Sequence, residues 1–187
     1  MPNPYIETVK NSKLLSAFRL PVYRWLWVSN LAESMGFMPF MLAQGWVILE
    51  MTDSPFMVGL APGLGGIANM LFSPFAGVLV DRLNRKTILI LAQVIMGAAI
   101  LLLGILILLE LVEIWHILCV SMVQRTMMGL QLTARNTLMY TLVGPQVFMN
   151  AMAGQFMSSH LSFIVGPITA GAIMAGLGSG ILFLLIS

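Results

Sequence analysis

The sequence is poor in charged residues, which make up 9% of its 187 residues, whereas a soluble domain carries about 25%. A water-soluble surface cannot be built from so few charges, and 59% of the residues are hydrophobic. The net charge of +2 is too small to indicate a nucleic-acid partner. The solvent for most of this chain is therefore expected to be a lipid bilayer.

Cysteine and histidine are also scarce. Cys119 is the one cysteine, so an internal disulfide is impossible. With one cysteine and two histidines, a metal site is not expected either. A G-x-G-x-x-A match at residues 63–68 lies inside an apolar stretch with no strand before it, so it does not predict a dinucleotide site. The sequence predicts neither an enzyme nor a bound cofactor.

Long apolar runs are what the chain has instead. A spanning helix needs about 20 mostly apolar residues, and five such stretches are followed by the start of a sixth. The fold class expected is an all-α membrane bundle with helices over residues 23–49, 55–80, 87–109, 114–135, 150–176 and 180–187. The last stretch is only about 12 Å long at 1.5 Å per residue. We therefore expect a truncated sixth helix, in a fragment or in a truncated gene product.

The few charges alternate in sign between successive linkers. Lysine and arginine occur before the first helix and in the 82–86 linker, and Arg135 is expected to end the fourth helix on the same side. The opposite linkers carry only acidic residues. Short basic loops remain in the cytoplasm, so the amino terminus is expected inside. Residues 1–22 are then a cytosolic tail, with an interfacial amphipathic segment around Leu14, Leu15 and Phe18.

Three ionisable side chains are expected near the middle of the bilayer, one on each of three predicted helices: Glu33, Arg125 and His160. Such groups are costly in a membrane, at about 2.5–3.5 kcal/mol each on insertion scales. We expect Glu33 and Arg125 to pair, either as a switchable pair that couples transport to protons or as a fixed structural bridge. His160 is either a third proton-coupling group or a hydrogen-bonded packing residue.

Polar residues continue these positions along helix faces at helical spacing. Asn30, Phe37 and Gln44 share a stripe with Glu33, and Ser121 shares one with Arg125. These four residues are expected to line a cavity. The glutamines inside the helices are expected to form hydrogen bonds between helices; they are Gln93, Gln124, Gln131 and Gln155.

The segment GVLVDRLNRKTIL, residues 77–89, resembles the loop signature of the major facilitator superfamily. Asn84 stands where the signature usually has glycine and is expected to tolerate a left-handed backbone. The resemblance implies that this loop gates transport by locking helices together. The residues that it assigns to the gating loop are Gly77, Asp81, Arg82, Arg85 and Lys86.

Two further segments resemble the same superfamily. Arg125 followed by Gly129 is similar to its fourth-helix motif, whose arginine is linked to proton coupling. The fifth predicted helix contains an exporter-like motif made of Gly166, Pro167, Ala170 and Gly171. Together with the runs WLWVSN and TDSPFMVGL, these residues are similar to the branch of enterobactin-exporter-like and multidrug efflux proteins.

This resemblance implies the amino-terminal six-helix half of a transporter in a cell membrane, with a bacterial source. The function expected is proton-driven efflux of a small organic molecule, such as a drug or siderophore, with a second transporter half or a homodimer partner. Two alternatives remain open at this point. One is an importer or uniporter on the same scaffold, and the other is a truncated membrane protein that acts only by assembling with a partner half.

Overall fold

The computed structural model describes residues 21–187. The predicted cytosolic tail, with its interfacial segment, therefore lies almost entirely outside the described residues. The described part contains helices and no strands, which confirms the all-α prediction. The helices are α2 (Pro21–Thr52), α3 (Pro55–Arg82), α4 (Arg85–Leu108), α5 (Ile114–Val143), α6 (Pro145–Leu177) and α7 (Ser179–Ile186).

Local sequence signals set most of the helix ends. Pro55 and Pro145 each occupy the first turn of a helix, where the missing N–H costs nothing and the fixed φ suits the helix. Gly144, with φ +74°, separates α5 from α6. Asn84, which was expected to tolerate a left-handed backbone, does not adopt one. Its φ is −66°, and its side chain accepts a hydrogen bond from the Lys86 N–H at 3.0 Å, so it caps α4 instead.

Two helix boundaries differ substantially from the prediction. Helix α5 continues eight residues past Arg135 to Val143, and α6 begins at Pro145 rather than Asn150. The prediction took Arg135 as the end of a span, because arginine is typical of cytoplasmic linkers. The chain turns instead at Gly144–Pro145, a glycine–proline pair that cannot continue a helix. Arg135 therefore lies inside α5, eight residues before the end of the helix.

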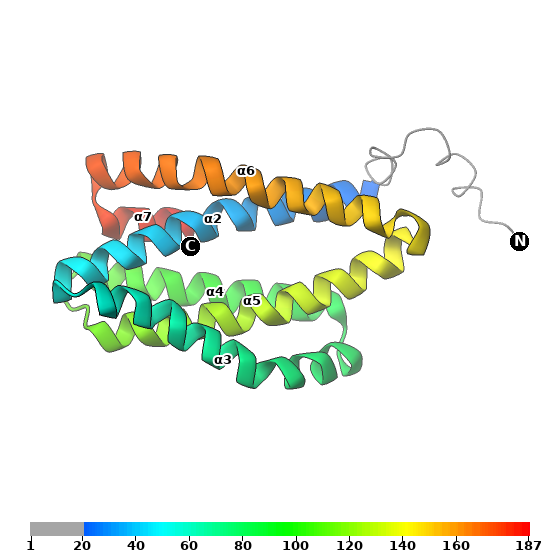
Figure 1. Ribbon diagram of the computed structural model, residues 1–187, viewed down its shortest axis with the longest axis horizontal. Coiled ribbons are helices and arrows are strands. Elements are labelled where there is room, and N and C mark those ends of the chain that lie inside the picture. Colours follow the sequence, from blue (N-terminus) through cyan, green and yellow to red (C-terminus); the bar gives the residue numbers. More distant parts are fainter. Residues whose placement is uncertain (1–20) are drawn as a thin grey trace, which may run out of the picture.

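The helices run alongside one another in two groups, as Figure 1 shows. One group pairs α2 with α6, and the short α7 lies against both. In the other group α3 packs along α5, and α4 packs against α5. Helix α4 also contacts α7, so it joins the two groups. The contact between α2 and α5 is less extensive, and this α2–α5 seam is where the polar side chains of both groups meet.

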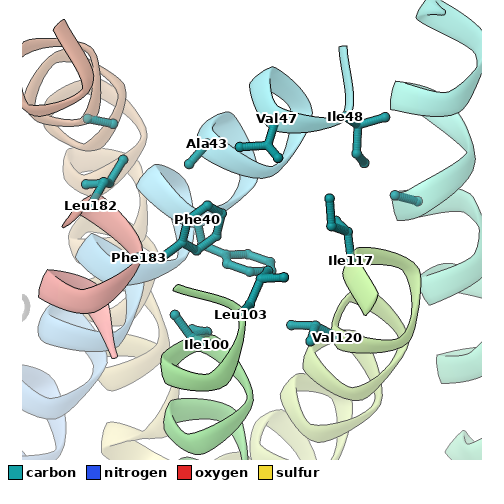
Figure 2. Close-up of a cluster of buried hydrophobic side chains, with 12 residues drawn as sticks. Phe40, Ala43, Val47, Ile48, Ile100, Leu103, Ile117, Val120, Leu182 and Phe183 are labelled. Carbon is teal, nitrogen blue, oxygen red and sulfur yellow. The ribbon is translucent and has the colours of Figure 1, made fainter. Parts of the chain in front are cut away.

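The core lies near the α2–α3 and α4–α5 turns, where the groups are held together by apolar side chains (Figure 2). Phe40 of α2 and Phe183 of α7 meet edge to face, with ring centroids 5.9 Å apart. Leu103 of α4 and Ile117 of α5 are also almost fully buried. Close packing here fixes how α2, α4, α5 and α7 are rotated relative to one another.

Helices α3, α4 and α6 are, within the described residues, long and apolar enough by length and composition to cross a membrane. Helices α2 and α5 have 32 and 30 residues, well above the length of about 20 residues that a bilayer requires. They are also the helices that carry Glu33, Arg125 and Arg135 in their interiors. The less apolar helices are thus the ones that bring charge into the bundle.

Candidate functional site

A buried ion pair joins α2 to α5. The Nη2 of Arg135 donates to the Oε2 of Glu33, and the side chains of the two residues are 10% and 15% exposed. This is the one salt bridge within residues 21–187. Removing one partner from a buried pair leaves an uncompensated charge, which costs about 3–5 kcal/mol. Each of these two side chains therefore depends on the other for its place in the bundle.

The prediction that Glu33 pairs with Arg125 is wrong. The Arg125 guanidinium lies over the Phe37 ring, 5.3 Å from its centroid, and its Nη2 is 3.6 Å from the Met41 sulfur. Arg125 and Arg135 are ten residues apart, which is about 15 Å along α5 and about 80° around its axis at 3.6 residues per turn. Both side chains reach α2, but only Arg135 reaches the carboxylate of Glu33.

Asn30 anchors the arginine of this pair. Its Oδ1 accepts hydrogen bonds from Arg135 Nη1 at 2.6 Å and from Gln155 Nε2 at 3.1 Å. Its Nδ2 donates to the Ser158 hydroxyl at 2.6 Å. Two nitrogens of the guanidinium are thus held, because Nη1 donates to Asn30 and Nη2 donates to Glu33. Arginine supports this fork geometry and lysine does not. Asn30 links α2, α5 and α6 at one point.

Gln131 of α5 completes the surroundings of Glu33. When its amide is oriented with the nitrogen toward α2, that nitrogen donates to the two carboxylate oxygens of Glu33, at 2.5 and 3.2 Å. The other atom of the amide lies 3.0 Å from the side-chain oxygen of Gln93 on α4. Gln131 is 2% exposed. The sequence predicted a hydrogen bond between helices at Gln131 but did not connect it with Glu33.

The ion pair lines a cavity of about 200 Å³ between α2, α5 and α6. Its remaining wall is mostly methionine and phenylalanine, an adaptable and apolar surface suited to an organic molecule. Within the described residues, Glu33 and Arg135 are the charged side chains that line it. The apolar residues that line it are Phe37, Met38, Met96, Met128, Leu132, Met152, Phe156 and Phe163.

Four residues were predicted to line a cavity, and the structure places two of them at this cavity and two elsewhere. Asn30 and Phe37 do line this cavity. Gln44 and Ser121 are not among its lining residues, because both side chains face neighbouring backbones. Gln44 Nε2 donates to the Ile117 carbonyl at 3.5 Å, and the Ser121 hydroxyl donates to the Ala61 carbonyl at 3.0 Å. His160 is exposed on α6, beside Phe163, and is not part of the hydrogen-bonded network around Glu33.

The predicted gating loop lies at the α3–α4 turn, with Gly77 and Asp81 in the last turns of α3. Arg85 Nη1 donates to the Thr141 hydroxyl at 2.8 Å, so the start of α4 is tied to the last turns of α5. Asp81, Arg82 and Lys86 are exposed. The loop therefore reaches the same helix that carries Arg135, and its gating role stays a prediction.

The exporter-like motif on α6 is divided between two faces. Gly166 lies so close to α2 that an added Cβ would come within 2.6 Å of the Met38 Cβ. Ala170 is completely buried in the core, and Pro167 lies inside the helix. Gly171 has open space around it. Gly166 and Ala170 thus permit the close α2–α6 contact that places Asn30 beside Ser158.

A multi-helix bundle with an apolar surface and a charged pair beside an internal cavity defines a multi-pass membrane protein with a polar site between its helices. Residues 12–187 match the family model described as transmembrane secretion effector, and the chain belongs to this family of major facilitator superfamily transporters. The superfamily expected from the loop signature is therefore confirmed. The enterobactin-exporter-like branch stays a prediction.

Two curated relatives are macrolide efflux protein A from Streptococcus pyogenes and the same protein from a serotype M6 strain of that organism. Each is 32% identical to this chain over 124 residues, which is 66% of this chain and 30% of the relative. The matched segment thus spans less than a third of the length of these relatives.

Proposed function

We propose that the protein exports a small organic molecule across a bacterial cell membrane, driven by protons that move inward through Glu33. The observation that carries this proposal is the Glu33–Arg135 pair, buried in the bundle at the wall of an apolar cavity. A carboxylate inside a membrane is costly to maintain and marks a functional position by default. The family assignment supports transport, and the names of the bacterial relatives support the outward direction.

Exchange of protons for substrate requires that the two compete for one group. Arg135 and Gln131 hold the carboxylate of Glu33 by charge and by hydrogen bonds. A proton that reaches Glu33 breaks the ion pair and loosens the α2–α5 seam. A substrate that donates hydrogen bonds to the carboxylate favours the ionised form and so competes with the proton. This competition requires the cavity and the ion pair to be adjacent, as they are.

Membrane orientation and assembly are part of the same proposal. The basic residues at the α3–α4 turn support a cytoplasmic position for that turn, and with it for the amino terminus. The substrate cavity is then completed by a second transporter half, a carboxy-terminal half or another copy of this chain. The single-half cavity of about 200 Å³ is smaller than the roughly 300–1,000 Å³ of typical ligand sites, in keeping with a site shared by two halves.

The test is accumulation of a labelled macrolide, and of a labelled catecholate siderophore, in inside-out vesicles with an acidic lumen. An exporter accumulates one of these probes, and collapse of the pH gradient abolishes the accumulation. Glu33→Gln should abolish it too, because the amide retains the shape of the side chain but does not titrate. Glu50→Gln is the matched control on the exposed end of the same helix and should leave accumulation intact.

Two results would contradict the proposal. Uptake in right-side-out vesicles with the gradient, and none in inside-out vesicles, would show an importer. Gradient-driven accumulation that survives Glu33→Gln in a correctly folded protein would show that Glu33 is not the coupling group.

A further inference from the structure

Gln131 lies between Glu33 and Gln93, on a helix that packs against α4 and meets α2 at the seam. One atom of its side-chain amide is 2.5 Å from Glu33 Oε1, and the other is 3.0 Å from the side-chain oxygen of Gln93. An amide has a donor end and an acceptor end of nearly the same shape. Turning the amide therefore presents either a donor or an acceptor to Glu33, while the rest of the side chain stays in place.

The ionised form of Glu33 requires one of these orientations. A carboxylate accepts hydrogen bonds and cannot donate them, so the nitrogen of Gln131 must face it. That nitrogen then donates to Oε1 and Oε2 at 2.5 and 3.2 Å. The oxygen of Gln131 then accepts from the backbone N–H of Gln93 at 3.2 Å. It also lies 3.0 Å from the side-chain oxygen of Gln93, so the amide of Gln93 must turn as well to donate to it.

The protonated form of Glu33 is satisfied by the other orientation. The oxygen of Gln131 then lies 2.5 Å from Glu33 Oε1, a distance suited to an O–H donor on that oxygen. The nitrogen of Gln131 donates at the same time to the side-chain oxygen of Gln93 at 3.0 Å. Both orientations leave the buried amide with partners at its two ends, as a buried polar group requires.

We propose that the side-chain amide of Gln131 turns with the protonation state of Glu33, donating to the carboxylate and accepting from the carboxyl group, and that the amide of Gln93 turns with it. Gln131 is on this account a positioning residue, and α4 receives the protonation state of α2 through Gln93. The proposal rests on the proposed function in one respect, namely that Glu33 gains and loses a proton.

Few other titratable groups line the two cavities beside Glu33. A second cavity, of about 280 Å³, lies on the other side of Glu33 and is lined by Gln93 and Gln124. Across both cavities, the ionisable side chains contributed by the described part of α2, α4, α5 and α6 are Glu33 and Arg135. Arginine keeps its charge in proteins, and Ser187 at the end of α7 also lines the second cavity with its carboxyl group, so Glu33→Gln is needed to assign a band to Glu33.

Infrared difference spectra between acidic and alkaline pH test the proposal on the purified protein. The carboxyl C=O band of protonated Glu33 is identified by its loss in Glu33→Gln. In Gln131→Met this band should move to higher frequency, because the carboxyl group loses its hydrogen-bond acceptor.

Gln124→Met is the matched control, because Gln124 is equally buried on α5 and donates to the Met96 carbonyl of α4 at 2.8 Å. It should leave the Glu33 band unchanged. If Gln131→Met does not fold, Gln131→Asn retains an amide that is one methylene too short to reach Glu33, and the same band shift is expected.

Two results of the infrared experiment would each contradict a specific claim. An unshifted carboxyl band in Gln131→Met would show that Gln131 does not accept from the protonated form of Glu33, and would overturn the proposal. A wild-type spectrum with no titrating band assignable to Glu33 would contradict the proposed function itself.

Discussion

Arg135 and Arg125 lie on the same helix and both reach across to α2, yet the bundle treats them differently. Arg135 is 8% exposed and is held by Asn30 and by the carboxylate of Glu33. Arg125 is only partly buried, and its contacts across to α2 are a phenyl ring and a thioether. One arginine is neutralised by an acid, whereas the other keeps its positive charge beside weakly polar groups.

The difference follows from helix geometry and not from local sequence. Ten residues separate the two arginines, which turns them about 80° apart around the axis of α5. The same difference affects their neighbours. Arg125 packs against the backbone of α3 at Gly65, where an added Cβ would lie 2.5 Å from the arginine Cγ. Arg135 instead faces the seam between α2 and α5, where a polar partner is available.

The largest expected effect is the loss of Arg135. Arg135→Met leaves Glu33 buried without a partner, and we expect it to lower the free energy of unfolding by about 3–5 kcal/mol. Arg125→Met removes the cation–π contact with Phe37 and the contact with the Met41 sulfur, and should cost about 1 kcal/mol. Denaturant titration of the purified protein in detergent measures both. Equal losses for the two arginines would mean that the ion pair stabilises the fold no more than the contacts of Arg125 do.

A smaller effect is expected where Arg125 meets α3. Gly65→Ala places a methyl group against the Arg125 side chain and the Ser121 carbonyl, so α3 must move away from α5. We expect a loss of about 1–3 kcal/mol, as for other overpacked sites. Gly59→Ala on the same helix is the control, because nothing lies within 4 Å of its added Cβ. The same denaturant titration distinguishes the two, and a tolerated Gly65→Ala would contradict the close α3–α5 contact.

The smallest effect concerns the aromatic partner of Arg125. Phe37→Leu and Arg125→Met, made singly and together, should show a coupling energy of about 0.5–1 kcal/mol in unfolding. The same cycle with Phe56→Leu instead of Phe37→Leu should show no coupling energy, because Phe56 is 72% exposed at the start of α3. If the Phe37 cycle also gives zero, the guanidinium does not lie over the ring in the membrane protein.

Much of the fold follows from the sequence. Apolar runs longer than about 20 residues predict spans, and Pro55 and the acidic linkers marked real helix ends. The two large boundary errors, at the end of α5 and the start of α6, arose because the charge of Arg135 was taken as the end of a span. Gly144–Pro145 was the better signal, since neither residue favours a continuing helix. Helix α5 is longer than a bilayer requires, and the pattern of charges alone does not indicate this length.

The candidate site was predicted in part. Glu33 was expected to pair with Arg125, and it pairs instead with Arg135 of the same helix, α5. Pairing across α2 and α5 depends on the axial offset and the rotation of both helices, which are set by the packing of Phe40, Leu103, Ile117 and Phe183 far from the charges. Neither quantity is encoded in the spacing along one helix. The proximity of Asn30 to Arg135 is missed for the same reason.

Double-mutant cycles in unfolding test the central claim most directly. Glu33→Gln is combined once with Arg135→Gln and once with Arg125→Gln. We predict a coupling energy of at least about 1.5 kcal/mol for Glu33 with Arg135, as for close charge pairs, and less than about 0.5 kcal/mol for Glu33 with Arg125, as for separate sites. A large coupling with Arg125 and none with Arg135 would contradict the arrangement on which the account of transport depends.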